Sequence, residues 1–276
     1  MTSLVGKVGG HVTLVSDIPP KEIFQCFIMN PRARIPITRL KKIKETITPF
    51  KSKTFKIAHA GYVVAPWSKD EAISAKSIVD IGLSSMICKY LNISYYLIHL
   101  PATILDMDEF TAILKKIRDA VEKPIVMVFE IVAAKPTKLD CIGGPPLERL
   151  HKVNAAIESI FGKGEYGLCI DTAHVFGLGV PLTTAEDAMT FIKSVDPLPV
   201  SVLHFNGNAY TLGRGKDKHG DIAGVTDNIW SSDSSGARVV LKWAIGKNIP
   251  VILERHGRSS IEDYIPERVF LQTLLV

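Results

Sequence analysis

Short apolar segments alternate with longer amphipathic segments along the whole chain of 276 residues. The apolar segments have the length and composition of buried parallel strands, and the segments between them have the 3.6-residue apolar period of helices. This alternation predicts a parallel sheet with helical crossovers. The strand segments are residues 8–15, 23–28, 55–59, 95–99, 125–130, 167–171, 200–204 and 250–254, and the helical segments are residues 38–47, 70–91, 106–121, 147–161, 184–195, 235–247 and 261–275.

The number of strand segments favours closure of the sheet into a barrel. A (β/α)8 barrel uses about 250 residues for its eight strand–helix units, which suits both the length of this chain and its eight strand segments. No linker, repeat or low-complexity tract divides the chain. We therefore predict an α/β fold, a (β/α)8 TIM barrel, as a single domain over residues 1–276. An open doubly wound sheet is the structural alternative.

Composition sets broad limits on the class of protein. No apolar run reaches the roughly 18 residues of a membrane span, and the first residues lack the apolar region of a secretory signal, so we expect an intracellular protein that is neither secreted nor membrane-bound. The formal net charge of +5 permits binding to a polyanion without requiring it. The four cysteines are widely spaced, and we expect reduced thiols. A disulfide between two of them stays open.

Six of the predicted strands end in an ionisable residue. Buried strands rarely carry charge unless it is paired or bound to a metal, and in a barrel the carboxyl ends of all strands lie on the face that holds the active site. A single residue of this kind is commonly just a hydrogen-bonded strand end. Six at the same structural position predict one shared centre: His59, His99, Glu130, Asp171, His204 and Glu254.

Three further residues enlarge this set. His174 follows Asp171 by three positions, at the start of a loop or helical turn, and Asp217 and His219 close a Gly-rich loop after His204. Imidazole nitrogens and carboxylate oxygens both suit zinc. The nine residues are five histidines, two aspartates and two glutamates, too many for one ion with three or four protein ligands, but suited to a cluster of two or three ions.

Several motifs resemble those of the endonuclease IV type of apurinic/apyrimidinic (AP) endonucleases. CIDTAHVFGLGV is similar to the Asp-Thr-x-His segment of that family, and HFNGNAYTLGRGKDKH is similar to its His-x-Asn…Asp-x-His segment. GGHVTLV, YYLIHLPAT, IVMVFEIVA and VILER resemble the ends of its strands. The similarity extends from about Gly10 to Arg255, with all nine expected metal ligands present in order.

The resemblance implies three zinc ions at the carboxyl-terminal face of the barrel, with Mn²⁺ possible in one site because an N/O donor set accepts it. One ion would be held by His59, His99 and Glu130. A second would share Glu130 and add Asp171, His204 and Glu254. The third would be held by the remaining residues, which are His174, Asp217 and His219.

The same resemblance implies zinc-dependent endonuclease activity in DNA base excision repair. A zinc-activated hydroxide would attack the phosphodiester 5′ to an abasic site and leave a 3′-hydroxyl and a 5′-deoxyribose phosphate. Glu254, Glu130 and Asp171 would be the catalytic carboxylates. We expect the partner to be double-stranded DNA containing abasic sites, and the protein to act as a monomer.

The family bends its DNA and fills the gap left by flipped nucleotides. Tyr62 and Arg32 match the inserting positions, and an aromatic ring and a guanidinium both stack on bases. The alternative is that Tyr62 packs under a loop and Arg32 is a solvated surface charge. Further candidates for DNA phosphate contacts are Arg34, Lys216, Lys218 and Arg255.

The chain also departs from the family pattern. Ile131 follows Glu130 where Asn is usual, Gly207 stands where an acid is usual, and Ala209 stands where Lys is usual. These changes spare the metal ligands and affect the expected DNA contacts and loops. A TIM-barrel sugar isomerase or epimerase with a divalent metal is the alternative enzyme, although such enzymes use fewer metal ligands. A DNA-binding protein without catalysis is the third class.

Overall fold

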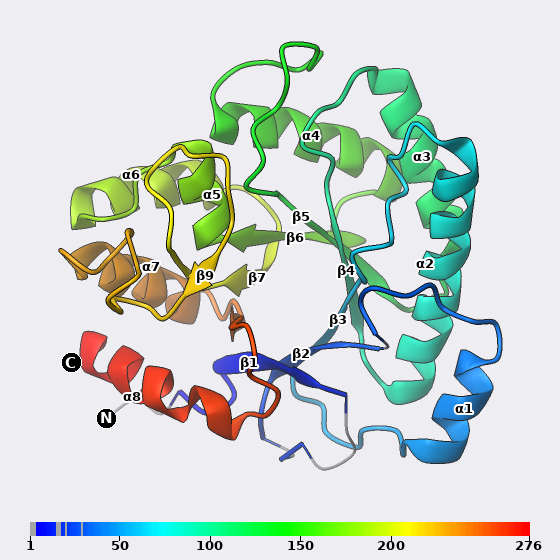
Figure 1. The fold of residues 1–276 in the computed structure, drawn as a ribbon, viewed down its shortest axis with the longest axis horizontal. Helices are drawn as coiled ribbons and strands as arrows, with labels where there is room; N and C mark the ends of the chain where they lie inside the picture. The colour runs from blue at the N-terminus through cyan, green and yellow to red at the C-terminus, as the bar shows by residue number, and fades with distance from the viewer. Residues whose placement is uncertain (1–3, 15–17, 20, 29) are drawn as a thin grey trace.

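The computed structural model describes residues 4–14, 18–19, 21–28 and 30–276. Its eight long strands form a closed parallel barrel in the order β1-β10-β7-β6-β5-β4-β3-β2, with β2 pairing back to β1 (Figure 1). This confirms the predicted (β/α)8 barrel and excludes the open sheet. The strands are β1 (Val8–Thr13), β2 (Phe24–Phe27), β3 (Lys56–His59), β4 (Tyr95–His99), β5 (Val126–Glu130), β6 (Tyr166–Asp171), β7 (Val200–His204) and β10 (Val251–Leu253).

Helices surround the barrel (Figure 1). Asp70 and Asp106 cap α2 and α3 through side-chain bonds to backbone N–H groups of the first turn, as their position before an apolar pattern predicts. Thr38, which precedes α1, makes no side-chain capping bond. The helices are α1 (Arg39–Thr46), α2 (Glu71–Leu91), α3 (Met107–Ala120), α4 (Pro146–Phe161), α5 (Thr172–Leu178), α6 (Ala185–Val195), α7 (Ser235–Gly246), η1 (Glu262–Tyr264) and α8 (Ile265–Leu274).

Two features lie on the carboxyl-terminal side of β6 and β7. Helix α5 begins directly after β6, and a short antiparallel hairpin, β8 (Gly207–Asn208) with β9 (His219–Gly220), follows β7. The sequence placed His174 in a loop or first turn, and the structure assigns it to α5. None of the helices described is long and apolar enough to cross a bilayer. All four cysteines are free thiols, which answers the open question about a disulfide.

An apolar plug closes the inside of the barrel. Seven strands each contribute one fully or nearly fully buried side chain to it, and β1 contributes Gly9 beside it. A Cβ at Gly9 would lie 1.9 Å from the carbonyl oxygen of Ile23, so only glycine fits there. Burying each of these large apolar side chains contributes about 1.5–3 kcal/mol. The plug residues are Ile23, Ile57, Leu97, Val128, Cys169, Val202 and Ile252.

The strand period of two determines what lies above the plug. The next inward-facing residue on each strand is two positions closer to the carboxyl end, and on all eight strands that residue is polar. A slip of one residue in strand register would turn these polar groups toward the helices. The resulting ring consists of His11, Gln25, His59, His99, Glu130, Asp171, His204 and Glu254.

A buried ion pair anchors the loop that follows β5. Asp140 receives two bonds of 3.0 Å from the guanidinium of Arg149 and further bonds from the backbone N–H groups of Ile104 and Gly143. Burial alone would raise the pKa of Asp140, but these donors lower it from 3.8 to about 2. The pair therefore joins the loop after β5 to the loop after β4 and to α4.

Replacement of Asp140 by Asn is expected to lower the free energy of unfolding by roughly 2 kcal/mol at neutral pH, because the stabilised carboxylate is lost. The folded pKa lies below the unfolded value, so this contribution is present above pH 3.8 and is lost as the pH falls toward 2. Urea unfolding at a series of pH values measures it. Asp119→Asn, which removes an exposed pair with Arg118, should cost less than about 1 kcal/mol. Equal losses for the two variants would contradict the prediction.

Candidate metal centre

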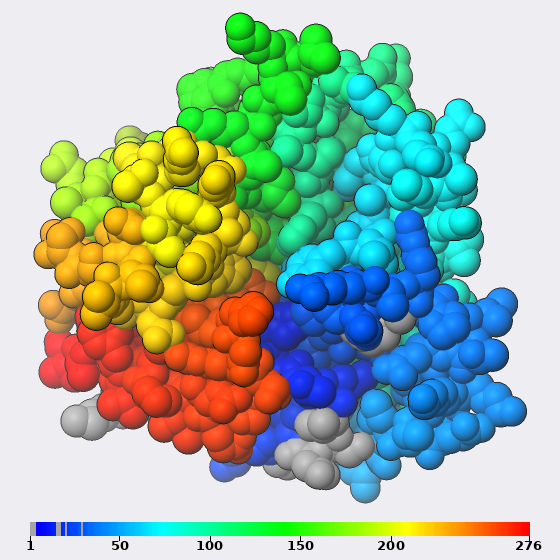
Figure 2. Space-filling view, viewed as in Figure 1, coloured from blue at the N-terminus to red at the C-terminus, as the bar shows by residue number. Residues whose placement is uncertain are grey.

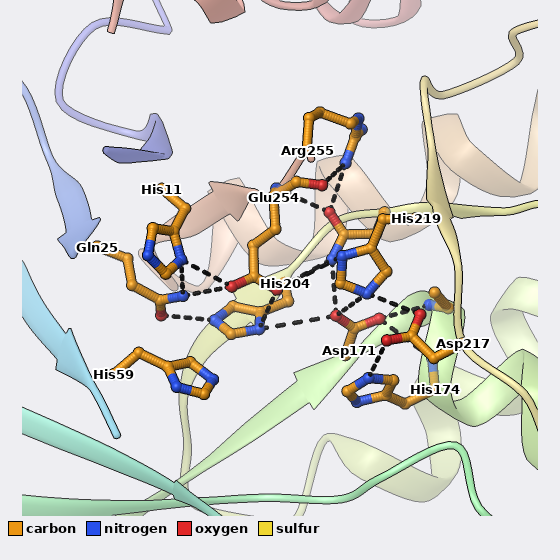
Figure 3. Close-up of polar contacts among 12 residues, drawn as sticks. His11, Gln25, His59, Asp171, His174, His204, Asp217, His219, Glu254 and Arg255 are labelled. Carbon is orange, nitrogen blue, oxygen red and sulfur yellow. Dashed lines mark hydrogen bonds and ion pairs between the residues drawn. The ribbon is translucent and has the colours of Figure 1, made fainter. Parts of the chain in front are cut away.

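The polar ring and three loop residues converge at the carboxyl-terminal mouth of the barrel (Figure 3). Strand ends supply six of the nine predicted ligands, helix α5 supplies His174, and the segment ending in the β8–β9 hairpin supplies Asp217 and His219. Residues separated by up to 195 positions in the sequence, from His59 to Glu254, thus lie around one centre. The structure brings all nine predicted ligands together.

Glu130 lies at the middle of this centre and is fully buried. One of its oxygens is 3.4 Å from Nε2 of His59 and 3.3 Å from Nε2 of His99. The other is 3.0 Å from Nδ1 of His204 and 3.2 Å from Nδ1 of His174. Burial would raise the pKa of Glu130, but the surrounding histidines, led by His204 and His99, hold it well below its ordinary value. Glu130 is therefore an ionised carboxylate shared by four imidazoles.

Asp171 joins the barrel to helix α5. Its Oδ1 caps the helix by accepting bonds from the N–H groups of Ala173 (2.6 Å) and His174 (3.1 Å). Its Oδ2 accepts a 2.6 Å bond from the side chain of Asn206 and lies 3.4 Å from Nε2 of His219. The carboxylate is thereby held rigidly, with one oxygen on the helix and the other in the polar centre.

The β8–β9 hairpin brings in the last two predicted ligands. Asp217 lies 3.2 Å from Nε2 of His174 and 3.0 Å from Nε2 of His219. Burial would raise the pKa of Asp217, but these two histidines lower it well below its ordinary value. Gly207, where the family has an acid, leaves space that Asp227 fills, since a Cβ there would lie 2.7 Å from its carboxylate carbon. Asp227 in turn accepts bonds from four backbone N–H groups of the same region.

Glu254 lies on the groove side of the centre. Its side chain is 14% exposed, against 1% for Glu130 and 0% for Asp171. One oxygen contacts His11 and Gln25, and the other lies 3.2 Å from Nδ1 of His204. Burial would raise its pKa, but His204 and His11 keep it well below its ordinary value. Of the three predicted catalytic carboxylates, Glu254 is the most accessible from the groove.

The donor atoms fit a cluster of divalent cations. Among the described residues, four sets of possible ligand atoms lie within 4.8 Å of one another: His59–His99–Glu130, Asp171–His204–Glu254, Asp171–His174–His219 and Glu130–Cys169–His204. Asp217 lies beside the set that contains His174 and His219, at 3.2 and 3.0 Å from these two rings. Oε2 of Glu130 and Nε2 of His219 are buried, and although charged or polar atoms lie close to both, neither atom makes a hydrogen bond among the described residues. Buried polar atoms are normally hydrogen-bonded, and a metal ion would satisfy both. Neutral imidazoles and ionised carboxylates are the ligands that zinc takes.

A groove of about 760 Å³ opens over this centre. Figure 2 shows the hollow between the segment around residues 253–258 (orange) and the loops of the first third of the chain (blue and cyan). Six of the predicted ligands reach its wall, so a bound molecule would meet the polar centre directly. These are His59, His99, His174, Asp217, His219 and Glu254.

Three of the predicted DNA-contacting residues are exposed around the groove. The ring of Tyr62 is 64% exposed and packs edge-on against Phe27, with the ring centroids 5.6 Å apart. Tyr62 and Lys218 line the groove, and Arg32 is exposed beside it, next to the lining residue Pro31. Lys216 is also exposed, with its ammonium group 5.4 Å from the ring centre of Tyr210.

The other two predicted contacts are engaged within the protein. Arg34 bonds to Ser77 and Asp80 of α2 at 3.0 and 2.8 Å. Arg255 is 8% exposed and pairs with Glu267 of α8, and it also donates to Oδ1 of Asn206 at 2.6 Å. With these partners, Arg255 connects α8 to the polar centre through Asn206.

Two residues of the centre were absent from the sequence-based set. Asn206 was noticed only as part of a motif, and its amide donates to Asp171 while its oxygen accepts from the backbone N–H of Glu254. Gln25 was overlooked because glutamine is neither charged nor a common metal ligand. The sequence does contain a signal for Gln25. It lies two positions after the plug residue Ile23, and each strand-end ligand likewise lies two positions after the plug residue of its own strand.

Curated relatives match nearly the whole chain, although no protein-family model matches it. A probable AP endonuclease of African swine fever virus (isolate Tick/Malawi/Lil 20-1/1983) is 27% identical over 274 residues, which cover 95% of this chain and 88% of the relative. A probable endonuclease 4 of Thermosipho melanesiensis is 28% identical over 287 residues, which cover 96% of this chain and 97% of the relative.

Solved structures agree on the fold. The structure described as AsfvAP:AG has a TM-score of 0.76 at 24% identity, covering 99% of this chain and 100% of that one. Endonuclease IV from Thermus thermophilus has a TM-score of 0.70 at 19% identity, with 98% of each chain covered. A D-allulose 3-epimerase from Methylomonas has a TM-score of 0.59 at 13% identity, with 98% of each chain covered. Over nearly its full length, the chain is similar to AP endonucleases of the endonuclease IV type, which are phosphodiester hydrolases, and it has the same barrel fold with the predicted ligands in one centre.

Proposed function

We propose that this protein is a zinc-dependent AP endonuclease of DNA base excision repair. It hydrolyses the phosphodiester 5′ to an abasic site, leaving a 3′-hydroxyl and a 5′-deoxyribose phosphate. The observation that carries the proposal is the convergence of nine nitrogen and oxygen ligands beneath an open groove. Curated relatives that bear the names AP endonuclease and endonuclease 4 support the same activity.

The carboxylates of the centre have different roles in the proposed reaction. Divalent ions bound at such a centre act as Lewis acids on the phosphate and make water nucleophilic near neutral pH. Glu130 and Asp171 are buried and fixed by their partners, so they hold the centre together. Of the three catalytic carboxylates, Glu254 is the most accessible from the groove, where it orients the attacking water and accepts its hydrogen bond. The water oxygen bonds to phosphorus as the bond to the 3′ oxygen breaks.

Substrate recognition uses the exposed residues around the groove. Tyr62 and Arg32 fill the gap in a bent duplex by stacking on the bases beside the abasic sugar. Lys216 and Lys218 contact backbone phosphates. Because Arg34 and Arg255 already have acidic partners, their part is to hold the loops in place rather than to contact the phosphates.

Replacement of Tyr62 by Ala is expected to weaken binding of an abasic duplex by roughly 10- to 100-fold, because an aromatic ring stacked on a base contributes about 1–3 kcal/mol. Tyr62→Phe keeps the ring and should bind within about threefold of the wild-type protein. Fluorescence anisotropy with an abasic duplex measures both affinities. If the Ala and Phe variants bind equally well, Tyr62 does not stack on the substrate.

Incision of a duplex with a single abasic site tests the proposed function. The expected products carry a 3′-hydroxyl on one side of the cut and a 5′-deoxyribose phosphate on the other, which a polymerase extension assay and mass spectrometry identify. An intact duplex of the same sequence is the control. Absence of incision together with epimerisation of a ketohexose would instead establish the sugar epimerase alternative, whose fold this chain shares.

A further inference from the structure

The polar ring inside the barrel contains a single carboxamide, Gln25. The other seven members, from His11 to Glu254, are ionisable, and six of them are predicted metal ligands. Gln25 lies on β2, is fully buried, and points into the barrel beside His204 and Glu254 (Figure 3). It carries no charge and lies too deep to contact DNA, so its role must come from its hydrogen bonds.

Gln25 bonds to three members of the ring at once. Its Oε1 is 2.8 Å from Nε2 of His204, and its Nε2 is 2.9 Å from Nδ1 of His11 and donates to Oε1 of Glu254. The orientation of the amide follows from Glu254, since the opposite orientation would place two oxygens with only acceptor character against each other. The carbonyl oxygen of Gln25 therefore faces His204.

This orientation determines which nitrogen of His204 carries the proton. An amide oxygen only accepts, so Nε2 of His204 must be the N–H donor. In the neutral ring Nδ1 then carries the lone pair, and Nδ1 is the atom that lies 3.0 Å from Glu130 and 3.2 Å from Glu254. The partner of the distal ring nitrogen is what orients a ligating histidine and sets its tautomer.

Glu254 is held from two sides by amide groups. Gln25 donates to its Oε1, and the Nδ2 atom of Asn206 lies 3.5 Å from its Oε2. A glutamate at position 25 would put a carboxylate against Glu254, and a leucine would leave Nε2 of His204 without an acceptor. Glutamine is the residue of that size that supplies one acceptor and one donor.

We propose that Gln25 is a positioning residue of the metal centre, which directs Nδ1 of His204 toward the cation site and fixes the carboxylate of Glu254 beside it. The inference rests on the proposed function, because it assumes that the centre holds divalent ions. Loss of a residue that hydrogen-bonds to a metal ligand typically weakens metal binding by about 10- to 100-fold.

The test uses three variants of the full chain. Gln25→Met keeps the volume and removes both hydrogen bonds, whereas Gln25→Glu keeps the acceptor for His204 and removes the donor to Glu254. Cys26→Ala is the matched control, because Cys26 is the next residue of β2, is equally buried, and faces the helices on the other side of the strand. Zinc affinity is measured by competition with a chromophoric chelator, and the tautomer of His204 by ¹⁵N NMR of the zinc-bound protein, in which the ligating ring is neutral.

We expect Gln25→Met to bind one zinc ion roughly 10- to 100-fold more weakly and to show a mixed His204 tautomer. Its kcat for abasic DNA should fall while KM stays unchanged, because Gln25 does not reach the groove. Gln25→Glu should retain the wild-type tautomer with weakened zinc binding, and Cys26→Ala should retain both properties. If Gln25→Met fails to fold, the isosteric Gln25→Glu still tests the contact with Glu254.

The outcomes separate the two proposals. A wild-type protein that binds no zinc would overturn the proposed function, and the ¹⁵N–¹H signal of the Nε2–H group of His204, compared between the wild-type protein and Gln25→Met, would still test the contact with Gln25. A wild-type protein that binds zinc, with unchanged affinity and tautomer in Gln25→Met, would overturn the role of Gln25 alone. The same result follows if Cys26→Ala weakens zinc binding as much as Gln25→Met does.

Discussion

Replacement of Glu254 by Gln is expected to lower kcat for incision of abasic DNA by about 10⁴-fold, the scale of loss when one member of a cooperating catalytic unit is removed. The substitution keeps the size and shape of the side chain. It removes the negative charge that lies against His204 and faces the groove. Single-turnover kinetics with saturating enzyme measure the effect on the chemical step. Circular dichroism should show that the barrel remains folded, because no volume is lost.

Glu45 provides a matched control for this prediction. It is an exposed glutamate on the outside of α1, so Glu45→Gln makes the same chemical change away from the centre and should leave kcat unchanged. His174→Ala should behave like Glu254→Gln, because it removes a partner of both Glu130 and Asp217. An Ala or Gln variant at either position that cuts at the wild-type rate would show that the centre has been assigned wrongly.

Removal of the metal ions is expected to abolish incision while the barrel remains folded. The apolar plug and the helices around the barrel do not depend on the centre, so circular dichroism should change little. Deeply held ions exchange slowly, and the treatment should combine a strong chelator with long dialysis. Elemental analysis before and after treatment gives the number of ions per chain, for which we expect three zinc ions, with manganese possible in one site.

Restoring activity to the metal-free protein identifies the ion that incision requires. Addition of Zn²⁺ to the metal-free protein should restore incision, and Mg²⁺ should not, because five of the nine ligands are imidazoles and magnesium prefers oxygen. Full activity in a sample with no detectable metal would contradict both the ligand assignment and the mechanism.

The barrel and its ligands could be predicted to a large extent from the sequence. Six of the buried strands end in a residue of the wrong polarity for a core, as His59, Glu130 and His204 show, and this conflict is readable without coordinates. The set was then extended by position, to His174 three residues after Asp171 and to Asp217 and His219 in the loop after His204. Local sequence is a weaker guide at Thr38, which lies before α1 but makes no side-chain capping bond, because its backbone is already in the helical region rather than the extended one that a capping residue adopts.

Other roles could not be predicted because they depend on partners distant in the sequence. Arg255 was expected to contact DNA, and it lines the groove, but the sequence did not indicate that its guanidinium pairs with Glu267 on the last helix. Gln25 has no property that marks it in isolation. Its partners, His204 and Glu254, lie 179 and 229 positions away in the sequence.

The order of apolar and polar residues along each strand by itself determined the barrel and the side chains that face its interior, because a strand alternates its side chains with a fixed period of two. Only the tertiary structure decided how those side chains interact. Closure of the sheet brought eight inward positions around one axis, and the loops added His174, Asp217 and His219 above them. Distances of a few ångströms between separate strands decide the role of each group. They determine which carboxylate is shared by four imidazoles, which carboxylate faces the groove, and which nitrogen of His204 is free.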